Sequence, residues 1–264
     1  HFDLIVVGGG RASGLAKAAA QSGLRTALVE RDKLGGACPN RGCVPSKLLI
    51  GFAEAARHVQ EAGRHFIDAE FKGADTSRIF ESVNDYVGGV DGRYEGRMNA
   101  AGVELIRGEA TFVGLKKLAI EDREITAENI VIATGSRPVD APFADLPVWT
   151  SDSLFPLQET PPNSLLVIGG GFIGCEMSAF FSGIGVETHL FARGGRLLGR
   201  EDGDIENVFQ AEFGKQVHTH CHSNLTDLRY DGAGFSATFD VHGKSQVFTA
   251  DRVLFAIGRR PNTE

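Results

Sequence analysis

The chain has 264 residues, which predicts two domains at roughly 150 residues per domain. Hydrophobic residues make up 42% of the chain and charged residues 23%, so a core can be packed and disorder is not expected. A net charge of −7 argues against a nucleic-acid or acidic-membrane partner, and no apolar run approaches the ~20 residues of a transmembrane helix. Because the chain opens directly into an apolar strand, we expect no signal peptide and a cytoplasmic protein.

The chain follows one plan twice. Residues 3–10, DLIVVGGG, return at 165–171 as LLVIGGG. Residues 130–138, IVIATGSRP, return at 253–261 as VLFAIGRRP. Each copy therefore begins with an apolar strand and a glycine turn, and ends with an apolar strand followed by Gly-x-Arg-Pro.

A helix and a second apolar strand follow each glycine turn. We predict the first helix at about 14–22 with its strand at 26–30, and the second helix at about 173–182 with its strand at 186–192. Unbroken apolar strands joined through helices are typical of a parallel sheet covered on both faces. The predicted fold class is therefore α/β, with two Rossmann-like dinucleotide-binding domains.

Between these parts, long helical regions are predicted at about 46–65 and 76–101, and short strands at 111–113 and 118–121. Six prolines between residues 138 and 163 indicate a linker. We therefore predict three segments: a first domain at 1–140, a linker at 141–162 and a second domain at 163–264.

The second glycine turn carries a complete dinucleotide fingerprint between a strand and a helix. Gly169 allows the tight turn, Gly171 lets a pyrophosphate approach the backbone, and Gly174 lets helix and strand pack closely. The helix N-terminus then offers free N–H groups to the phosphates.

The first turn matches the fingerprint less completely. Gly8 and Gly10 fit, but Ser13, followed by Gly14, takes the third position, where a small residue still permits packing. For both turns the alternative is a glycine-rich turn that binds no ligand.

The residue that ends the second strand distinguishes the two sites. In the first copy it is Glu30, whose carboxylate suits ribose hydroxyls and repels a 2′-phosphate, so FAD or NAD is expected. In the second copy it is Ala192, followed by three arginines that suit the 2′-phosphate of NADP: Arg193, Arg196 and Arg200. The alternative for the arginines is a solvated basic turn.

The most specific stretch is residues 35–47, GGACPNRGCVPSK, which contains Cys38 and Cys43. A zinc site is disfavoured because zinc needs about four ligands and the other two cysteines, Cys175 and Cys221, are isolated. A redox dithiol fits better, because a helix N-terminus lowers the pKa of a thiol. Two unrelated buried cysteines are the remaining alternative, and we expect Cys175 to be a packing residue.

With these motifs the chain resembles the flavoprotein disulfide reductases of the pyridine nucleotide class, such as glutathione reductase, dihydrolipoamide dehydrogenase, mycothione reductase and mercuric reductase. The family carries Gly-Gly-Thr-Cys-x4-Cys-x-Pro-Ser/Lys-Lys, which this chain matches except for Ala37 in place of Thr. The resemblance implies an FAD domain followed by an NAD(P) domain. It also implies that Cys43 lies against the flavin while Cys38 attacks the substrate disulfide.

The resemblance assigns further residues. Lys47 would lie near the flavin and pair with Glu176, and Phe172 takes the position of a residue that covers the flavin until the nicotinamide arrives. Thr134 and Gly135, at the end of their strand, complete the expected cofactor-binding residues.

The expected function is transfer of electrons from NADPH through FAD to a Cys38–Cys43 disulfide, and on to a small-molecule disulfide or metal–thiol substrate. The alternatives are an NAD-dependent dihydrolipoamide dehydrogenase and a nucleotide-binding module without turnover. Family members continue into a dimerisation domain with a catalytic His–Glu pair, which we expect to be absent here. We therefore expect a homodimer for the full-length protein, and for the chain alone weak FAD binding and little disulfide turnover.

Three histidines, His218, His220 and His222, alternate along one segment. On a strand this spacing places all three on one face, where they could chelate zinc or nickel. We favour an exposed strand of neutral imidazoles and expect no metal site.

Overall fold

The computed structural model describes residues 1–157 and 160–263, which form two compact units. Unit 1 comprises residues 1–45, 85–137 and 261–263, and unit 2 comprises the described residues of 46–84, 138–157 and 160–260. Gln158 and Glu159, in the expected linker, and Glu264, at the end of the expected second domain, lie outside the described residues. The assignment of the two nucleotide-binding domains stays a prediction.

Unit 1 is built around one sheet in the strand order β3-β2-β1-β6-β5-β4. The first four strands are parallel, and β5 and β4 continue the sheet antiparallel to their neighbours. The elements of unit 1 are β1 (Phe2–Val7), α1 (Ser13–Gln21), β2 (Thr26–Glu30), α2 (Ala37–Arg41), α5 (Val90–Ala100), β3 (Glu104–Arg107), β4 (Ala110–Gly114), β5 (Lys117–Ile120) and β6 (Arg123–Ile132).

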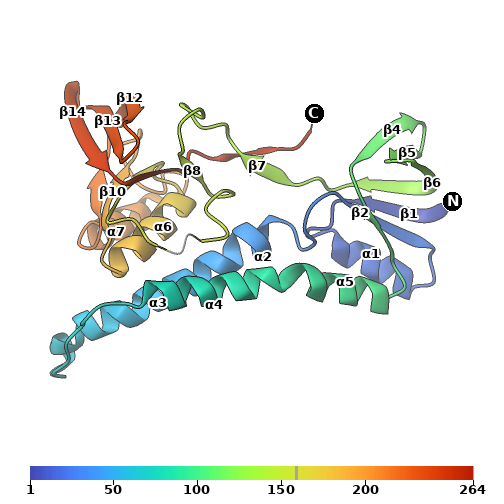
Figure 1. Ribbon diagram of the computed structural model, residues 1–264, viewed down its shortest axis with the longest axis horizontal. Helices are drawn as coiled ribbons and strands as arrows, with labels where there is room; N and C mark the ends of the chain where they lie inside the picture. The colour runs from blue at the N-terminus through green and yellow to red at the C-terminus, as the bar shows by residue number, and fades with distance from the viewer. Residues whose placement is uncertain (158–159, 264) are drawn as a thin grey trace. The chain divides into compact units, whose positions relative to one another are not determined.

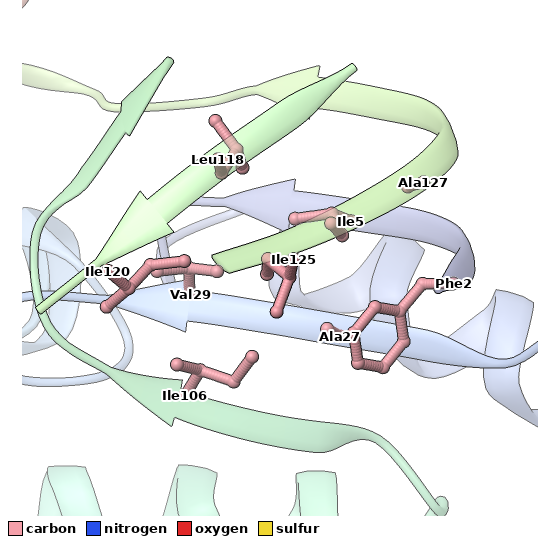
Figure 2. Close-up of a cluster of buried hydrophobic side chains, with 9 residues drawn as sticks. All are labelled: Phe2, Ile5, Ala27, Val29, Ile106, Leu118, Ile120, Ile125 and Ala127. Carbon is pink, nitrogen blue, oxygen red and sulfur yellow. The ribbon is translucent and has the colours of Figure 1, made fainter. Parts of the chain in front are cut away.

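Strands β1 and β2 are buried on both faces of this sheet, which explains why they are apolar without alternation. From β1, Ile5 points into a cluster that strands β5 and β6 complete (Figure 2), while Leu4 and Val6 point into a second cluster with residues of α1 and α5. In Figure 1, α1 and α5 lie together against the strands of unit 1. Each buried aliphatic side chain contributes ~1.5–3 kcal/mol relative to exposure.

Unit 2 contains a parallel sheet in the strand order β11-β10-β9-β15-β8 and an antiparallel sheet of β12, β13 and β14. Its elements are η1 (Ala62–His65), β8 (Trp149–Thr150), β9 (Ser164–Ile168), α6 (Phe172–Gly183), β10 (Glu187–Phe191), α7 (Gly203–Phe213), β11 (His218–His220), β12 (Ser223–Tyr230), β13 (Phe235–Val241), β14 (Lys244–Ala250) and β15 (Arg252–Phe255). Four elements cross the unit boundaries: α3 (Cys43–Gln60), α4 (Thr76–Gly88), β7 (Ser136–Pro138) and β16 (Arg259–Pro261).

The two parallel sheets share one topology. In each, the first strand of the copy lies between its second and its last strand, and the third strand lies outside the second. An antiparallel insertion precedes the last strand in both: β4 and β5 in unit 1, and β12–β14 in unit 2. This third-second-first-last order is that of one half of a doubly wound nucleotide-binding sheet. The predicted α/β class with two Rossmann-like halves is therefore confirmed.

Several predicted elements change in detail. The strand at 26–30 has the bounds of β2, but the predicted helix at 76–101 is two helices, α4 and α5, separated at Gly89. Residues 46–84, expected in the first domain, belong to unit 2, where Phe80 packs against Phe180 and the Asn84 side chain bonds to the backbone of Leu157. None of the helices in the described residues is long and apolar enough to cross a membrane.

The prediction that three histidines share one strand face is wrong. Strand β11 ends at His220, and His222 adopts a left-handed φ of 51°, which turns the backbone out of the strand. The His220 ring instead stacks on His189 of the neighbouring strand, with Nδ1 of His189 2.9 Å from Nε2 of His220. Within the described residues, no group of three or more His, Cys, Asp or Glu side chains is arranged to hold a metal ion.

We predict that unit 2 loses stability in mild acid because of His220. Burial, followed by the nearby His189 and His218, lowers the pKa of His220 from 6.5 to about 4. Between these values the unfolded chain binds more protons than the folded one, so stability falls as pH drops from about 6.5 towards 4. His220→Gln, which keeps hydrogen-bonding groups but does not titrate, should reduce the difference in melting temperature between pH 7.5 and pH 4.5.

The matched control is His58→Gln, because His58 is exposed on α3 in the same unit and is not among the groups that lower the pKa of His220. This variant should keep the acid sensitivity of the unmutated chain. An equal pH dependence in His220→Gln and the unmutated chain would contradict the assignment.

Candidate functional site

The first fingerprint turn is built where β1 ends against the end of β6. Gly8 has a φ of 113°, and a Cβ atom there would lie 2.2 Å from the carbonyl oxygen of Ala133. Its N–H donates to the Val29 oxygen at 2.8 Å, and the Ala133 N–H donates to the Val7 oxygen at 2.8 Å. Only glycine fits this position, because any side chain would overlap the neighbouring backbone.

The second turn repeats this geometry. Gly169 has a φ of 124°, and its Cβ would lie 2.3 Å from the Ala256 oxygen. The backbone N–H of Gly169 donates to the Phe191 oxygen at 2.8 Å, as the N–H of Gly8 does to Val29. The two copies of the sequence therefore form the same turn, each within its own unit.

The third fingerprint position differs between the turns. A Cβ on Gly174 would lie 1.9 Å from the Gly169 oxygen, and here α6 begins at Phe172, directly after the turn. In the first turn Ser13 carries a Cβ, and α1 begins only at Ser13, whose N–H donates to Gly10 at 3.0 Å. Ser13 is buried, so the small residue is tolerated while the helix starts later along the chain.

The carboxylate of Glu30 is fixed at the first turn. Its Oε2 accepts from the Gly9 N–H at 2.7 Å, and its Oε1 accepts from the Asp32 N–H at 2.8 Å. In the second turn the corresponding contact is apolar, because a Cβ on Gly170 would lie 2.7 Å from the Cβ of Ala192. The two turns thus share a backbone conformation and differ in charge at the residue predicted to face a nucleotide ribose.

The three arginines that follow Ala192 are not equivalent. Arg196 pairs with the buried carboxylate of Glu206, with an Nη1–Oε2 distance of 3.3 Å. Arg193 and Arg200 are exposed, and neither forms an ion pair with another described residue. A surface pocket lies beside the loop that carries these arginines. It is lined by Gly195, Arg196, Asn207, Gln210, Ala211 and Thr219.

The dithiol segment packs directly against the first fingerprint turn. The Gly35 N–H donates to the Gly9 oxygen at 2.8 Å, and a Cβ on Gly36 would lie 2.8 Å from the Cα of Gly10. Cys38 lies in the short helix α2, and Cys43 is the first residue of α3.

A polar network missed by the sequence analysis holds this segment. The Nδ2 atom of the buried Asn40 donates to the oxygens of Leu34 and Gly36 at 2.8 and 2.9 Å. The Leu34 N–H donates to Asp91 at 2.7 Å, and hydrogen bonds from Arg107 hold the pKa of Asp91 below its usual value. The position of Asn40 between the cysteines was a usable signal, whereas nothing in the sequence links Asp91 to Leu34.

Cys38 and Cys43 are not joined by a disulfide in the structure, and the Cys38–Cys43 disulfide stays a prediction. The pKa of Cys38 lies above its usual value, first because of burial and then because of hydrogen bonding and charge interaction with Cys43. The expected lowering of the pKa is therefore not seen at Cys38, since α2 has only five residues and the desolvation effect dominates. The backbone N–H of Cys43 and the Arg11 charge act in the opposite direction.

Lys47 and Glu176 form an ion pair within unit 2, joining α3 to α6. Phe172 is 66% exposed at the start of α6. Their predicted roles beside a flavin stay predictions.

Thr134 and Gly135 are held by a residue that the sequence analysis did not single out. The Thr134 hydroxyl donates to the Asn262 oxygen at 2.7 Å, and Asn262 Nδ2 donates to the Thr134 oxygen at 2.8 Å. Arg137 in turn donates to Asn262 Oδ1 at 2.6 Å. The segment that follows β6 is thereby held by Asn262, and the predicted cofactor contacts of Thr134 and Gly135 stay predictions.

Cys175 lies buried in α6, and burial raises the pKa of its thiol to about 12. Such a thiol carries almost no thiolate at neutral pH, as expected of a packing residue.

The residues of the first turn fit an FAD molecule. Gly8 and Gly10 form a glycine turn that packs on Gly36 of the dithiol segment, and Glu30 presents a carboxylate at the end of β2. The second turn fits the pyrophosphate of a pyridine nucleotide, because among the described residues no packing neighbour lies within 4 Å of where a Cβ on Gly171 would be.

Comparison with known proteins agrees with this geometry. A family model described as pyridine nucleotide-disulphide oxidoreductase matches residues 2–264, so the chain belongs to that enzyme family. The family is FAD-dependent and uses a pyridine nucleotide.

Three similar proteins illustrate the range of the family. Mercuric reductase of Staphylococcus aureus is 32% identical over 269 residues, covering 100% of this chain and 49% of that protein. Dihydrolipoyl dehydrogenase of Bacillus subtilis is 34% identical over 281 residues, covering 99% and 57%. The structure of the HOCl-induced flavoprotein disulfide reductase RclA of Escherichia coli superposes with a TM-score of 0.85 at 25% identity, covering 99% and 57%. The chain thus spans about half the length of these relatives.

We predict that alanine at two glycines of the second turn affects stability differently. Gly174→Ala should lower the free energy of unfolding by about 1–3 kcal/mol, because its Cβ overlaps the Gly169 oxygen. Gly171→Ala should leave stability nearly unchanged, because its φ of −82° suits any residue and its Cβ would meet no packing neighbour among the described residues. Chemical denaturation of both variants measures the difference.

Gly171→Ala should nevertheless weaken binding of a pyridine nucleotide, because its Cβ occupies the path of the pyrophosphate. Unchanged nucleotide affinity in this stable variant would show that the second turn is not the binding site.

Proposed function

We propose that the chain is the nucleotide-binding and dithiol part of an FAD-dependent, NADPH-linked disulfide reductase. The observation that carries the proposal is the packing of the dithiol segment on the first fingerprint turn, through Gly35–Gly9 and Gly36–Gly10 contacts. A redox dithiol placed against a nucleotide-binding turn is positioned to exchange electrons with the cofactor held there.

Within this proposal, FAD supplies a carrier that accepts hydride from a nicotinamide and passes two electrons to sulfur. The chain's own residues bind and orient it. Glu30 receives ribose hydroxyls, the first turn receives the pyrophosphate, and Thr134 and Gly135 border the cofactor at the end of β6. The family resemblance assigns Lys47, paired with Glu176, a role near the flavin, and gives Phe172 the position of a residue that covers the flavin until the nicotinamide arrives.

The proposed dithiol chemistry consists of one two-electron reduction followed by two thiol–disulfide exchanges. Two electrons and two protons convert the Cys38–Cys43 disulfide into two thiols. The Cys38 thiolate then attacks a substrate disulfide, forming a mixed disulfide and releasing one substrate thiol. Attack by the Cys43 sulfur on Cys38 restores the Cys38–Cys43 bond and releases the second substrate thiol.

NADPH is favoured over NADH by the second turn. Ala192 takes the place of a carboxylate that would repel a 2′-phosphate, and the exposed guanidinium groups of Arg193 and Arg200 suit that phosphate. Arg196 contributes less, because Glu206 already neutralises its charge.

A second candidate is an NAD-dependent dihydrolipoyl dehydrogenase, favoured by the 34% identity to the Bacillus subtilis enzyme. A metal–thiol substrate is a further candidate, because a relative is named mercuric reductase. Steady-state assays with glutathione disulfide, lipoamide and Hg(II), each with NADPH and NADH, discriminate among them.

For the whole protein we propose a cytoplasmic homodimer acting on a small-molecule disulfide. The dimer is supported by the family, whose members are typically dimeric. The cytoplasmic location is supported by the small number of cysteines, two of which we assign to a redox pair rather than to structural disulfides.

We predict that Cys38 and Cys43 form a disulfide in the oxidised protein, detectable by peptide mass mapping. Cys38→Ser should leave a Cys43 thiolate beside oxidised flavin and give a long-wavelength absorbance band. Cys43→Ser should abolish that band, because Cys38 is not the sulfur expected against the flavin. Cys221→Ser is the matched control and should behave like the unmutated protein. Two unlinked thiols in the oxidised protein would count against the proposal.

We predict that Arg193→Ala weakens NADPH binding roughly ten- to hundredfold, since a guanidinium–phosphate contact is worth ~1.5–3 kcal/mol. NADH binding should change little, because NADH lacks the 2′-phosphate. Arg229→Ala removes an exposed arginine from β12 in the same unit and serves as the charge control. Equal losses for both nucleotides, or a native preference for NADH, would favour the dihydrolipoyl dehydrogenase candidate instead.

A further inference from the structure

Arg11 places an exposed positive charge in the first fingerprint turn. It follows Gly10 directly and is exposed, and its guanidinium forms no hydrogen bond or ion pair with another described residue. The second turn has Phe172 at the same position after Gly171. The positive charge is therefore specific to the first turn, on which the dithiol segment packs. The second turn has the same backbone conformation without that charge.

Backbone packing brings this turn next to Cys38. The Gly35 N–H bonds to the Gly9 oxygen at 2.8 Å, and the Gly36 and Gly10 backbones meet where a Cβ on Gly36 would be 2.8 Å from the Gly10 Cα. Arg11 is one residue beyond Gly10, and Cys38 is two residues beyond Gly36. Both lie in unit 1, and the charge of Arg11 acts on the Cys38 sulfur.

Arg11 differs from the other groups that act on Cys38 because it is a charged side chain that favours the thiolate. Burial and the Cys43 thiol both favour the neutral form of Cys38. The backbone N–H of Cys43 and the guanidinium of Arg11 favour the thiolate, and Arg11 is the cationic side chain among them. A partly buried sulfur that must ionise to react therefore has one side chain that offsets the cost of ionisation.

We propose that Arg11 is a positioning residue for the redox reaction, which stabilises the thiolate of Cys38 and so increases its reactivity towards disulfides at neutral pH. The proposal rests on the proposed role of Cys38 as the sulfur that attacks substrate. Only the thiolate attacks a disulfide, so the fraction of Cys38 ionised sets the rate of the first exchange at a given pH.

The test is the pH profile of alkylation of Cys38 in a flavin-containing Cys43→Ser background. Reaction with iodoacetamide is followed by mass mapping of the peptide that contains Cys38, which separates it from Cys175 and Cys221. In this background Arg11→Gln should slow alkylation at pH 7 about three- to tenfold and shift the profile towards higher pH, as expected for loss of one nearby charge. Arg11→Lys should restore most of the rate.

Lys17→Gln is the matched control, because it removes one exposed positive charge from α1 of the same unit. Its profile should equal that of the background protein. Raising the salt concentration provides a second measurement that needs no substitution at Arg11, since screening should slow Cys38 alkylation in the background protein more than in Arg11→Gln.

Identical profiles for Arg11→Gln and the background would overturn the proposal, as would an equal shift in Lys17→Gln. The alkylation assay involves no turnover, so its failure is distinct from failure of the proposed function. A protein with the Arg11 effect but without NADPH-linked disulfide reduction would refute the proposed function and leave the electrostatic role of Arg11 in place.

Discussion

Twice in this chain, a strand turns towards a helix so close to a backbone carbonyl oxygen that no side chain fits. At Gly8 the obstructing oxygen belongs to Ala133, and at Gly169 it belongs to Ala256. In both cases the first strand of the copy is thereby held against the end of its last strand, with the second strand hydrogen-bonded on the other side. This close approach determines the backbone conformation of the turn. That conformation then determines where the next helix begins and which segments can pack on the turn.

The same backbone supports different chemistry in the two units because the surrounding side chains differ. Glu30 bonds to the first turn, whereas Ala192 packs against the second. The first turn also accepts a hydrogen bond from Gly35 at the start of the dithiol segment, while the second accepts one from Leu198 in the arginine-containing loop. The same turn conformation is therefore acidic and packed against two thiols in unit 1, and is followed by basic residues in unit 2. Two such nucleotide-binding turns and one dithiol are the parts that the proposed electron transfer from a nicotinamide to a disulfide needs.

The sequence allowed the parallel sheets, the two turns and the Glu30–Ala192 contrast to be predicted, because apolar strands and glycine spacing are local signals. It did not reveal the antiparallel strands β12–β14, where exposed polar residues weaken the pattern, nor the left-handed turn at His222. The support of the dithiol segment by Asp91 depends on a contact 57 residues away in the chain. The sign of the pKa change at Cys38 likewise depends on burial by residues distant in sequence.

The central claim is that the flavin and the dithiol form one redox unit, and an anaerobic reductive titration tests it most directly. The oxidised, flavin-containing protein is titrated with dithionite while flavin absorbance is followed. The account predicts that full reduction takes about two two-electron equivalents per flavin, one for the cofactor and one for the disulfide, and about one in the Cys38→Ser, Cys43→Ser double variant. Uptake of about one equivalent by the unmutated protein would contradict it, because the two cysteines would then store no electrons.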